Sequence, residues 1–112
     1  MQLEAKKFLL DVLTSCDAIQ EFAAGKSLED YTASRLIQSA TEREFEVIGE
    51  ALNRLRKLEP ETAAEISSLD LIIAFRNRII HGYDSVDEII VWNAIQNSVP
   101  VLRSEVQKLL GD

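Results

Sequence analysis

The sequence contains few residues of several types, and each shortage excludes a class of protein. Its 112 residues include one cysteine, Cys16, and one histidine, His81, so an intrachain disulfide and a structural zinc site are both excluded. No apolar run approaches the ~20 residues that a membrane-spanning helix needs. Glu4 and Asp11 interrupt the apolar N-terminal segment, which argues against a secretory signal. We therefore expect a cytoplasmic protein without a membrane anchor.

Positive charge is also scarce. The chain has 19 acidic and 12 basic residues, for a net charge of −7. Nonspecific nucleic-acid binding depends on neutralising phosphates, so this balance counts against a general, high-affinity DNA or RNA binder. It leaves room for a local basic cleft, for which the sequence offers Arg54, Arg56, Lys57, Arg76 and Arg78.

Four glycines and two prolines interrupt a pattern that is otherwise helical. Residues 2–24 carry one apolar stripe that includes Cys16, predicted to be buried, and Gly25 is a natural stop. Ser27, with Asp30 three residues later, is a candidate N-cap. A long helix should then end near Leu58, with an apolar face made of Leu36, Ala40, Val47, Ile48, Ala51, Leu52 and Leu55.

The second half predicts shorter helices. Pro60 should end the long helix and open a brief helical turn. A helix from Leu69 to about His81, capped by Ser67 or Ser68, should stop at Gly82. Ser85 and Glu88 match a capping box for a last segment that reaches Leu110, in which Pro100 either kinks the helix or begins a new one after Ser98. The sequence thus predicts one all-α domain over residues 1–112, an up-down bundle of four to five helices.

Gly49 lies inside the long predicted helix, where glycine costs roughly 1 kcal/mol relative to alanine. We therefore expect a structural reason for the absence of a side chain at this position. We predict close packing against a neighbouring helix.

The stretch FRNRIIHGYDSVD, residues 75–87, concentrates the chemically versatile side chains. Asn77 and His81 are four residues apart and share a helix face, whereas Arg76 and His81 point about 140° apart. A single helix therefore does not bring Arg76 and His81 together neatly. Two copies facing each other across a twofold axis, or unwinding of the helix end at Gly82, would do so.

These residue types suffice for metal-independent RNA cleavage. Histidine exchanges protons near neutral pH, because its unperturbed pKa is ~6.5. Arg76 would stabilise the charged phosphorane, Asn77 would orient the imidazole or hold a phosphate, and the ribose 2′-hydroxyl would be the nucleophile. A packed helix end is the alternative, since a histidine at a helix C-terminus gains from the helix dipole and Tyr83 could simply anchor the following loop.

Arg76, His81 and Tyr83 form an R-x4-H-x-Y pattern that resembles the motif of HEPN-domain proteins, specifically the HepT-like toxins of HEPN–MNT toxin–antitoxin modules. Two further segments resemble that family. VIGEALNRL, residues 47–55, is similar to its long central helix, and VDEIIVWNAIQNSVPVL, residues 86–102, is similar to its segment after the motif.

The resemblance implies a homodimeric HEPN-like bundle whose active cleft lies at the dimer interface. It implies an endoribonuclease toxin that needs no metal or cofactor, with Arg76 and His81 as the catalytic pair, Asn77 assisting, and a 2′,3′-cyclic phosphate product on tRNA or mRNA. The partner in this family is a minimal nucleotidyltransferase (MNT) antitoxin, which transfers AMP to the motif tyrosine, here Tyr83. Adenylate there would add negative charge and block RNA from Arg76.

Other features of the sequence qualify this resemblance. We expect Glu50 to support Arg54, one turn later, or the motif helix, rather than to react. Asp84 and Asp87 could suggest a metal pair, but we expect Ser85 and Asp87 to cap the next helix instead. A non-catalytic HEPN dimer that binds nucleotide or scaffolds the nucleotidyltransferase is the alternative interpretation, and an interaction subunit that only dimerises and holds this partner is a third.

Overall fold

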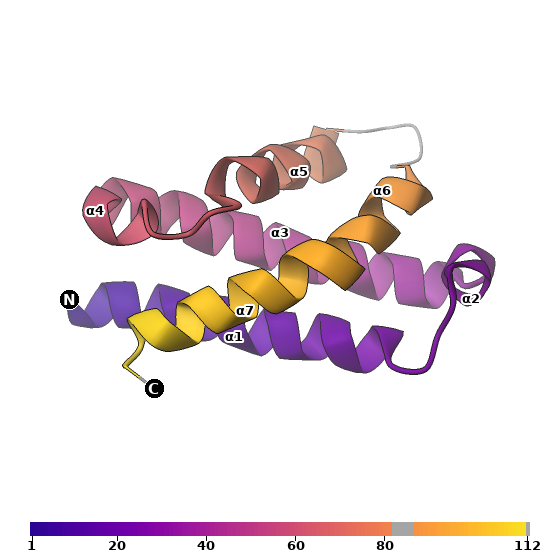
Figure 1. Ribbon diagram of the computed structural model, residues 1–112. Helices are drawn as coiled ribbons and strands as arrows, with labels where there is room; N and C mark the ends of the chain where they lie inside the picture. Colours follow the sequence, from indigo (N-terminus) through magenta and orange to yellow (C-terminus); the bar gives the residue numbers. More distant parts are fainter. Residues whose placement is uncertain (82–86, 112) are drawn as a thin grey trace.

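The computed structural model describes residues 1–81 and 87–111, which form helices and no strand (Figure 1). This confirms the all-α prediction for the described part, although the described residues form more helices than the four to five expected, because three short helices join the four long ones. In chain order they are α1 (Leu3–Ala23), α2 (Leu28–Ala33), α3 (Arg35–Leu58), α4 (Pro60–Ala63), α5 (Leu69–His81), α6 (Glu88–Asn93), the π-helical turn η1 (Ala94–Ser98) and α7 (Val99–Leu109).

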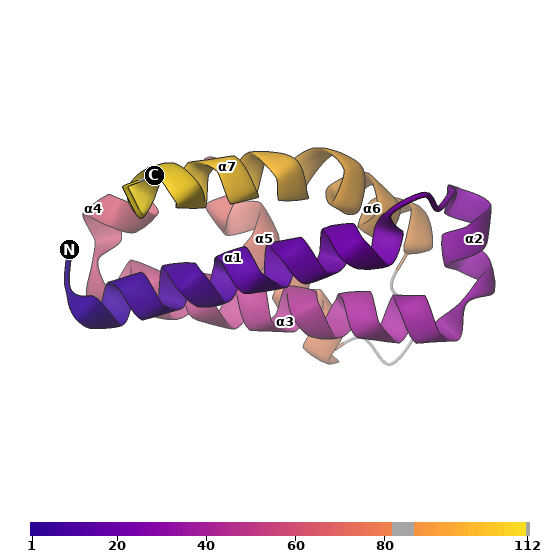
Figure 2. The same ribbon diagram turned by 90° about the horizontal axis from the view of Figure 1, so that it is seen from below.

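The long helices run alternately up and down. Helix α1 lies along α3, α5 packs on α3, and α7 packs on α1, as the two views in Figures 1 and 2 show. The short helices α2 and α4 lie at opposite ends of α3 (Figure 1). Because α3 contacts both α1 and α5, it fixes the motif helix to the body of the molecule.

Local signals in the first half act as predicted. Gly25 follows α1 with a φ of +71°, a conformation that glycine adopts without strain. Ser27 and Asp30 form a reciprocal capping box at the start of α2, with the Ser27 hydroxyl accepting from the Asp30 amide and the Asp30 carboxylate accepting from the Ser27 amide. Helix α3 ends at Leu58, and Pro60 opens α4.

Two predictions in the second half need correction. Helix α6 is capped by Asp87, whose carboxylate accepts from the amides of Ile89 and Ile90, and not by the predicted Ser85–Glu88 capping box. Ser85 and the expected stop at Gly82 lie outside the described residues. A new helix, α7, does begin after Ser98 with Pro100 in its first turn, as one of the two alternatives predicts, but the Ser98 side chain makes no cap hydrogen bond, and the π-helical turn η1 precedes this helix. A proline cannot donate to the preceding turn, so a widened turn accommodates it.

The core lies between the long helices. It contains Leu9, Val12, Cys16 and Ile19 of α1, as the stripe predicts, together with side chains of α3, α5 and α7. Burial raises the pKa of the Cys16 thiol to about 12.

Leu36 was expected in the core and is instead 80% exposed. It is nine residues from the buried Phe45, and at ~100° per residue it therefore points to the opposite side of α3.

Helices α3 and α5 approach each other closely at Gly49. A Cβ atom at this position would lie 2.2 Å from Cβ of Arg76 and 2.6 Å from its Cγ. This confirms the predicted close packing and identifies the neighbour as the motif arginine.

Among the described residues, no helix combines the length and the apolar character needed to cross a membrane.

Candidate functional site

Arg76 of α5 is held against α3. Its side chain is 24% exposed, and one terminal nitrogen donates to a Glu50 carboxylate oxygen at 2.7 Å. The other terminal nitrogen donates to the side-chain oxygen of Asn77 at 2.9 Å. The Nε atom is buried and has no hydrogen-bond partner among the described residues. Glycine at position 49 allows this geometry, because any side chain there would occupy the space of the Arg76 stem.

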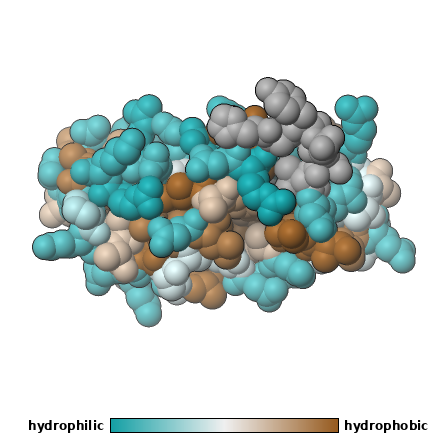
Figure 3. All heavy atoms as spheres, turned by 90° about the horizontal axis from the view of Figure 1, so that it is seen from above, coloured by the Kyte–Doolittle hydropathy of each residue, from teal (hydrophilic) through white to brown (hydrophobic). Residues whose placement is uncertain are grey.

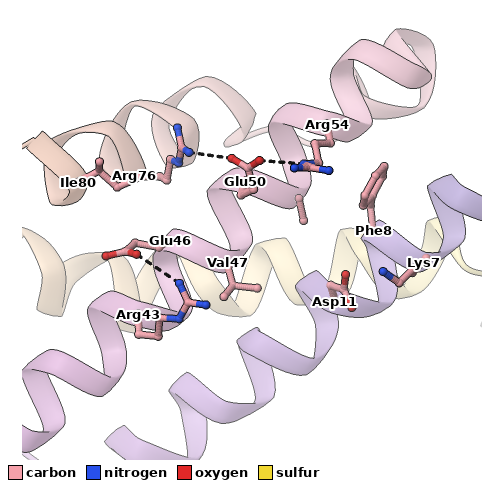
Figure 4. Close-up of a pocket in the computed structure, with 11 residues that line it drawn as sticks. Lys7, Phe8, Asp11, Arg43, Glu46, Val47, Glu50, Arg54, Arg76 and Ile80 are labelled. Carbon is pink, nitrogen blue, oxygen red and sulfur yellow. Dashed lines mark hydrogen bonds and ion pairs between the residues drawn. The ribbon is translucent and has the colours of Figure 1, made fainter.

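Glu50 joins two arginines (Figure 4). Its second oxygen accepts from Nε of Arg54 at 2.8 Å, one turn further along α3. The hydrogen bond from Arg54, followed by the positive charge of Arg76, lowers the pKa of the Glu50 carboxyl, so this group is ionised at neutral pH. Glu50 therefore contacts both Arg54 and the motif helix, the two candidates that the sequence offered for its support.

This cluster borders a groove of about 410 Å³ between α1, α3 and α5. Four cationic side chains line it, namely Lys7, Arg43, Arg54 and Arg76, together with the acids Asp11, Glu46 and Glu50 and the apolar residues Phe8, Val47, Ala51 and Ile80 (Figure 4). Long cationic side chains from three helices thus surround one space that is open to solvent.

The groove differs from the basic cleft that the sequence suggested. Arg54 and Arg76 belong to it, but Arg78 lines a different groove and Arg56 pairs with Asp70 at 3.3 Å. Lys7 and Arg43 were not predicted to belong to it, since nothing local in the sequence links them to a motif more than 30 residues away.

A second groove, of about 380 Å³, separates α5 from α6 and η1. Most of its lining is apolar, and Figure 3 shows apolar side chains gathered on this face. Leu71 and Ile90, which line it, are exposed, as is the neighbouring Ile89. The motif helix therefore has a charged groove on one flank and an apolar groove on the other.

The remaining motif residues are placed less completely. Asn77 is exposed on α5, one turn before His81, which is the last residue of that helix. Tyr83 lies outside the described residues, and the convergence of Arg76 with the His81 imidazole stays a prediction. Within the described residues, no three His, Cys, Asp or Glu side chains form a group that could hold a metal ion.

The arrangement can bind and stabilise anionic oxygen. The guanidinium groups of Arg54 and Arg76 lie on either side of one carboxylate and border an open groove, where phosphate oxygens are matching ligands for their remaining N–H groups.

The profile of one protein family, described as ribonuclease HepT-like, matches residues 12–109, which include this whole arrangement except Lys7, Phe8 and Asp11. The chain belongs to the ribonuclease HepT-like family.

Individual relatives agree with this assignment. The chain is 31% identical over 109 residues to "Putative RNase MJ0125" of Methanocaldococcus jannaschii, covering 97% of this chain and 93% of that protein. It is 29% identical over 114 residues to "Probable ribonuclease HepT" of Thermococcus cleftensis, covering 97% of this chain and 98% of that one. No solved structure matches the chain significantly. Both of these relatives are thus named as ribonucleases and align over nearly their full lengths.

Proposed function

We propose that this HepT-like protein is a metal-independent endoribonuclease toxin that cleaves RNA with Arg76 and His81. The observation that carries this proposal is the fixed position of Arg76 beside an open, cation-lined groove, on the helix that ends at His81. Glu50 and Asn77 both hold its guanidinium, so the group is oriented before substrate arrives. A phosphorane is stabilised by charged groups that are already in position before the reaction begins.

The reaction follows from these parts. The ribose 2′-hydroxyl attacks the adjacent phosphorus and loses its proton, while the bond to the 5′-oxygen of the next nucleotide breaks and that oxygen gains a proton. His81 handles one of these two protons, and Arg76 stabilises the doubly charged phosphorane oxygens. The products are a 2′,3′-cyclic phosphate and a free 5′-hydroxyl, and no metal or cofactor takes part.

Glu50 acts as a positioning residue in this scheme. Its carboxylate holds Arg76 and Arg54 by charge-assisted hydrogen bonds of 2.7 and 2.8 Å, but it also neutralises part of their charge. We expect Glu50→Gln to keep one hydrogen bond and to lower kcat more than it raises KM, because Arg76 would be less well oriented in the transition state.

The partners belong to the same proposal. A homodimer would bring two motif helices together, and the exposed apolar side chains of α5 and α6 support it, since such patches often mark protein interfaces. An MNT antitoxin would silence the toxin by moving AMP from ATP to the Tyr83 hydroxyl, with release of pyrophosphate. The toxin role, this partner and the tyrosine modification derive from the resemblance of the motif.

A second function has one observation in its favour. Arg76 is already paired with Glu50 and Asn77, so its role could be only to hold α5 against α3. The protein would then be a non-catalytic HEPN dimer that binds nucleotide or scaffolds the nucleotidyltransferase. In that case its loss would destabilise the fold, and neither the wild type nor the variant would cleave RNA.

RNA cleavage in EDTA by purified protein distinguishes the two functions, once intact mass has shown that Tyr83 carries no AMP. We expect the wild type to leave 2′,3′-cyclic phosphate ends, and His81→Ala and Arg76→Ala to be inactive. Arg35→Ala is the matched control, because it removes the same charge from an exposed side chain that lines neither groove. Absence of cleavage by the unmodified wild type, or equal activity of the wild type and His81→Ala, would refute the nuclease and favour the scaffold.

A further inference from the structure

The groove beside Arg76 continues away from the motif helix to α1, which contributes Lys7, Phe8 and Asp11 to its lining (Figure 4). A catalytic role for Arg76 and His81 does not explain these side chains. Lys7 is exposed and Phe8 is partly exposed, so both are accessible from the groove. The question is what a groove of this composition would bind.

Charge in the groove is the reverse of charge elsewhere. Its lining contains four basic and three acidic side chains, a net charge of +1, whereas the chain as a whole carries −7. The rest of the molecule therefore carries −8. Two of the three lining acids also pair with lining cations: Glu46 pairs with Arg43 at 3.5 Å, and Glu50 pairs with both Arg54 and Arg76. A polyanion repelled by the rest of the surface would be attracted here.

Phe8 adds a surface that a nucleobase can use. In Figure 4 its ring lies on the groove side of α1, between the Lys7 and Arg54 side chains. Proteins that bind single-stranded nucleic acid combine basic grooves with aromatic rings on which bases stack. A space of about 410 Å³ is in the range of pockets that bind small molecules, so it can take up a nucleotide.

We propose that the single-stranded RNA next to the scissile phosphate lies in this groove, crossing from α5 over α3 to α1. One base stacks on Phe8, and Lys7, Arg43 and Arg54 contact phosphates. This inference rests on the proposed function, since it takes Arg76 as the catalytic end of the groove. It explains how an acidic ribonuclease retains a substrate: one locally basic path serves a strand that the rest of the surface repels.

Binding of a fluorescently labelled single-stranded oligoribonucleotide, measured by anisotropy over a range of NaCl concentrations, tests the path. All proteins carry His81→Ala so that the RNA stays intact. Lys7→Glu is compared with Lys6→Glu, which makes the same change of charge on the adjacent exposed residue, outside the groove lining. We expect Lys7→Glu to weaken binding at least tenfold and to reduce the salt slope by about one, and Lys6→Glu to change either quantity much less.

Phe8→Leu, which keeps an apolar side chain against the core, is compared with Phe22→Leu, a similarly half-buried position on α1 away from the groove. Loss of stacking on one base corresponds to roughly 1–3 kcal/mol, so Phe8→Leu should weaken binding by about 5- to 150-fold. Circular dichroism confirms that each variant is folded. Equal effects within either pair, or no detectable binding by any protein at low salt, would overturn the inference.

The two proposals fail separately. If the wild type cleaves RNA through His81 but the Lys7 and Lys6 variants bind alike, the nuclease stands and the path is wrong. If binding depends on Lys7 and Phe8 but the wild type cleaves nothing, the groove is an RNA-binding site and the nuclease is wrong.

Discussion

Replacing Gly49 with alanine should move the motif arginine. The added Cβ would lie 2.2 Å from Cβ of Arg76, well below an ordinary contact of about 3.5–4 Å between carbon atoms, so α3 and α5 must separate by more than 1 Å at this crossing. Overpacking of this kind costs typically 1–3 kcal/mol, whereas the gain in helix propensity is about 1 kcal/mol. We therefore expect a net loss of up to about 2 kcal/mol in the free energy of unfolding.

The effect on RNA cleavage should be larger than the effect on stability. A separation of more than 1 Å displaces the Arg76 stem and breaks its 2.7 Å hydrogen bond to Glu50. Misplacement of a catalytic group by about 1 Å can cost 100-fold in rate. Urea denaturation measures the stability, and cleavage rates at saturating RNA measure the activity. Ser39→Ala, at an exposed position on the same helix, controls for helix propensity alone.

A double-mutant cycle refutes or supports the steric explanation. In an Arg76→Gly background no Cβ or Cγ remains at position 76 for the added methyl group to meet, so Gly49→Ala should now stabilise the protein by about 1 kcal/mol instead of destabilising it. The steric explanation is refuted if Gly49→Ala stabilises the protein in both backgrounds and the single variant cleaves RNA as fast as the wild type. In that case the close approach of α3 and α5 does not position Arg76.

Three further predictions concern the rest of the fold. Burial, with the nearby charges of Glu46 and Glu88, raises the pKa of Glu42, so ionisation of this carboxyl opposes folding. Glu42→Gln should therefore raise the free energy of unfolding at pH 7 by at most about 1 kcal/mol, and this gain should vanish below the pKa that Glu42 has in the unfolded chain. A gain that stays constant across a pH series would contradict this reasoning. The Cys16 thiol, with its pKa raised to about 12 by burial, should react with a disulfide reagent at pH 8 only after urea unfolds the chain, and rapid reaction of the native protein would show that the core opens. Ser27→Ala should cost about 1 kcal/mol in urea denaturation through loss of the α2 cap, whereas Ser104→Ala on the exposed surface of α7 should change little.

Local signals in the sequence predicted most helices and their ends, because each depends on neighbouring residues. The α1 stripe, the cap at Ser27 and the end of α3 before Pro60 are of this kind. The prediction for Leu36 was wrong because this residue, although apolar, points away from the side of α3 on which Phe45 is buried. Ser85 failed because Asp87, two residues later, is an equally good cap and lies next to the helix.

The site could be predicted only in part, since it depends on contacts between distant residues. Glu50 and Arg54 are one turn apart, so their pairing could be anticipated, but Glu50 and Arg76 are 26 positions apart and meet only because α5 packs on α3. Gly49 was the one local sign of that crossing. Nothing in the sequence near Lys7 indicated that α1 borders the same groove.

The π-helical turn at Ala94–Ser98 keeps the buried side chains before and after it on the same face of the last helical segment. A turn closed by i→i+5 hydrogen bonds holds more residues than an α-helical turn, so each residue advances by less than ~100°. Val91, Ile95 and Val99, spaced by four, therefore stay on one line and are all buried. With α-helical geometry throughout, Val99 would rotate by about 80° relative to Val91. In evolutionary terms η1 behaves as a one-residue insertion absorbed within a helix, so aligned relatives that lack the π turn should show a single-residue gap here while the packing of α7 on α1 is preserved.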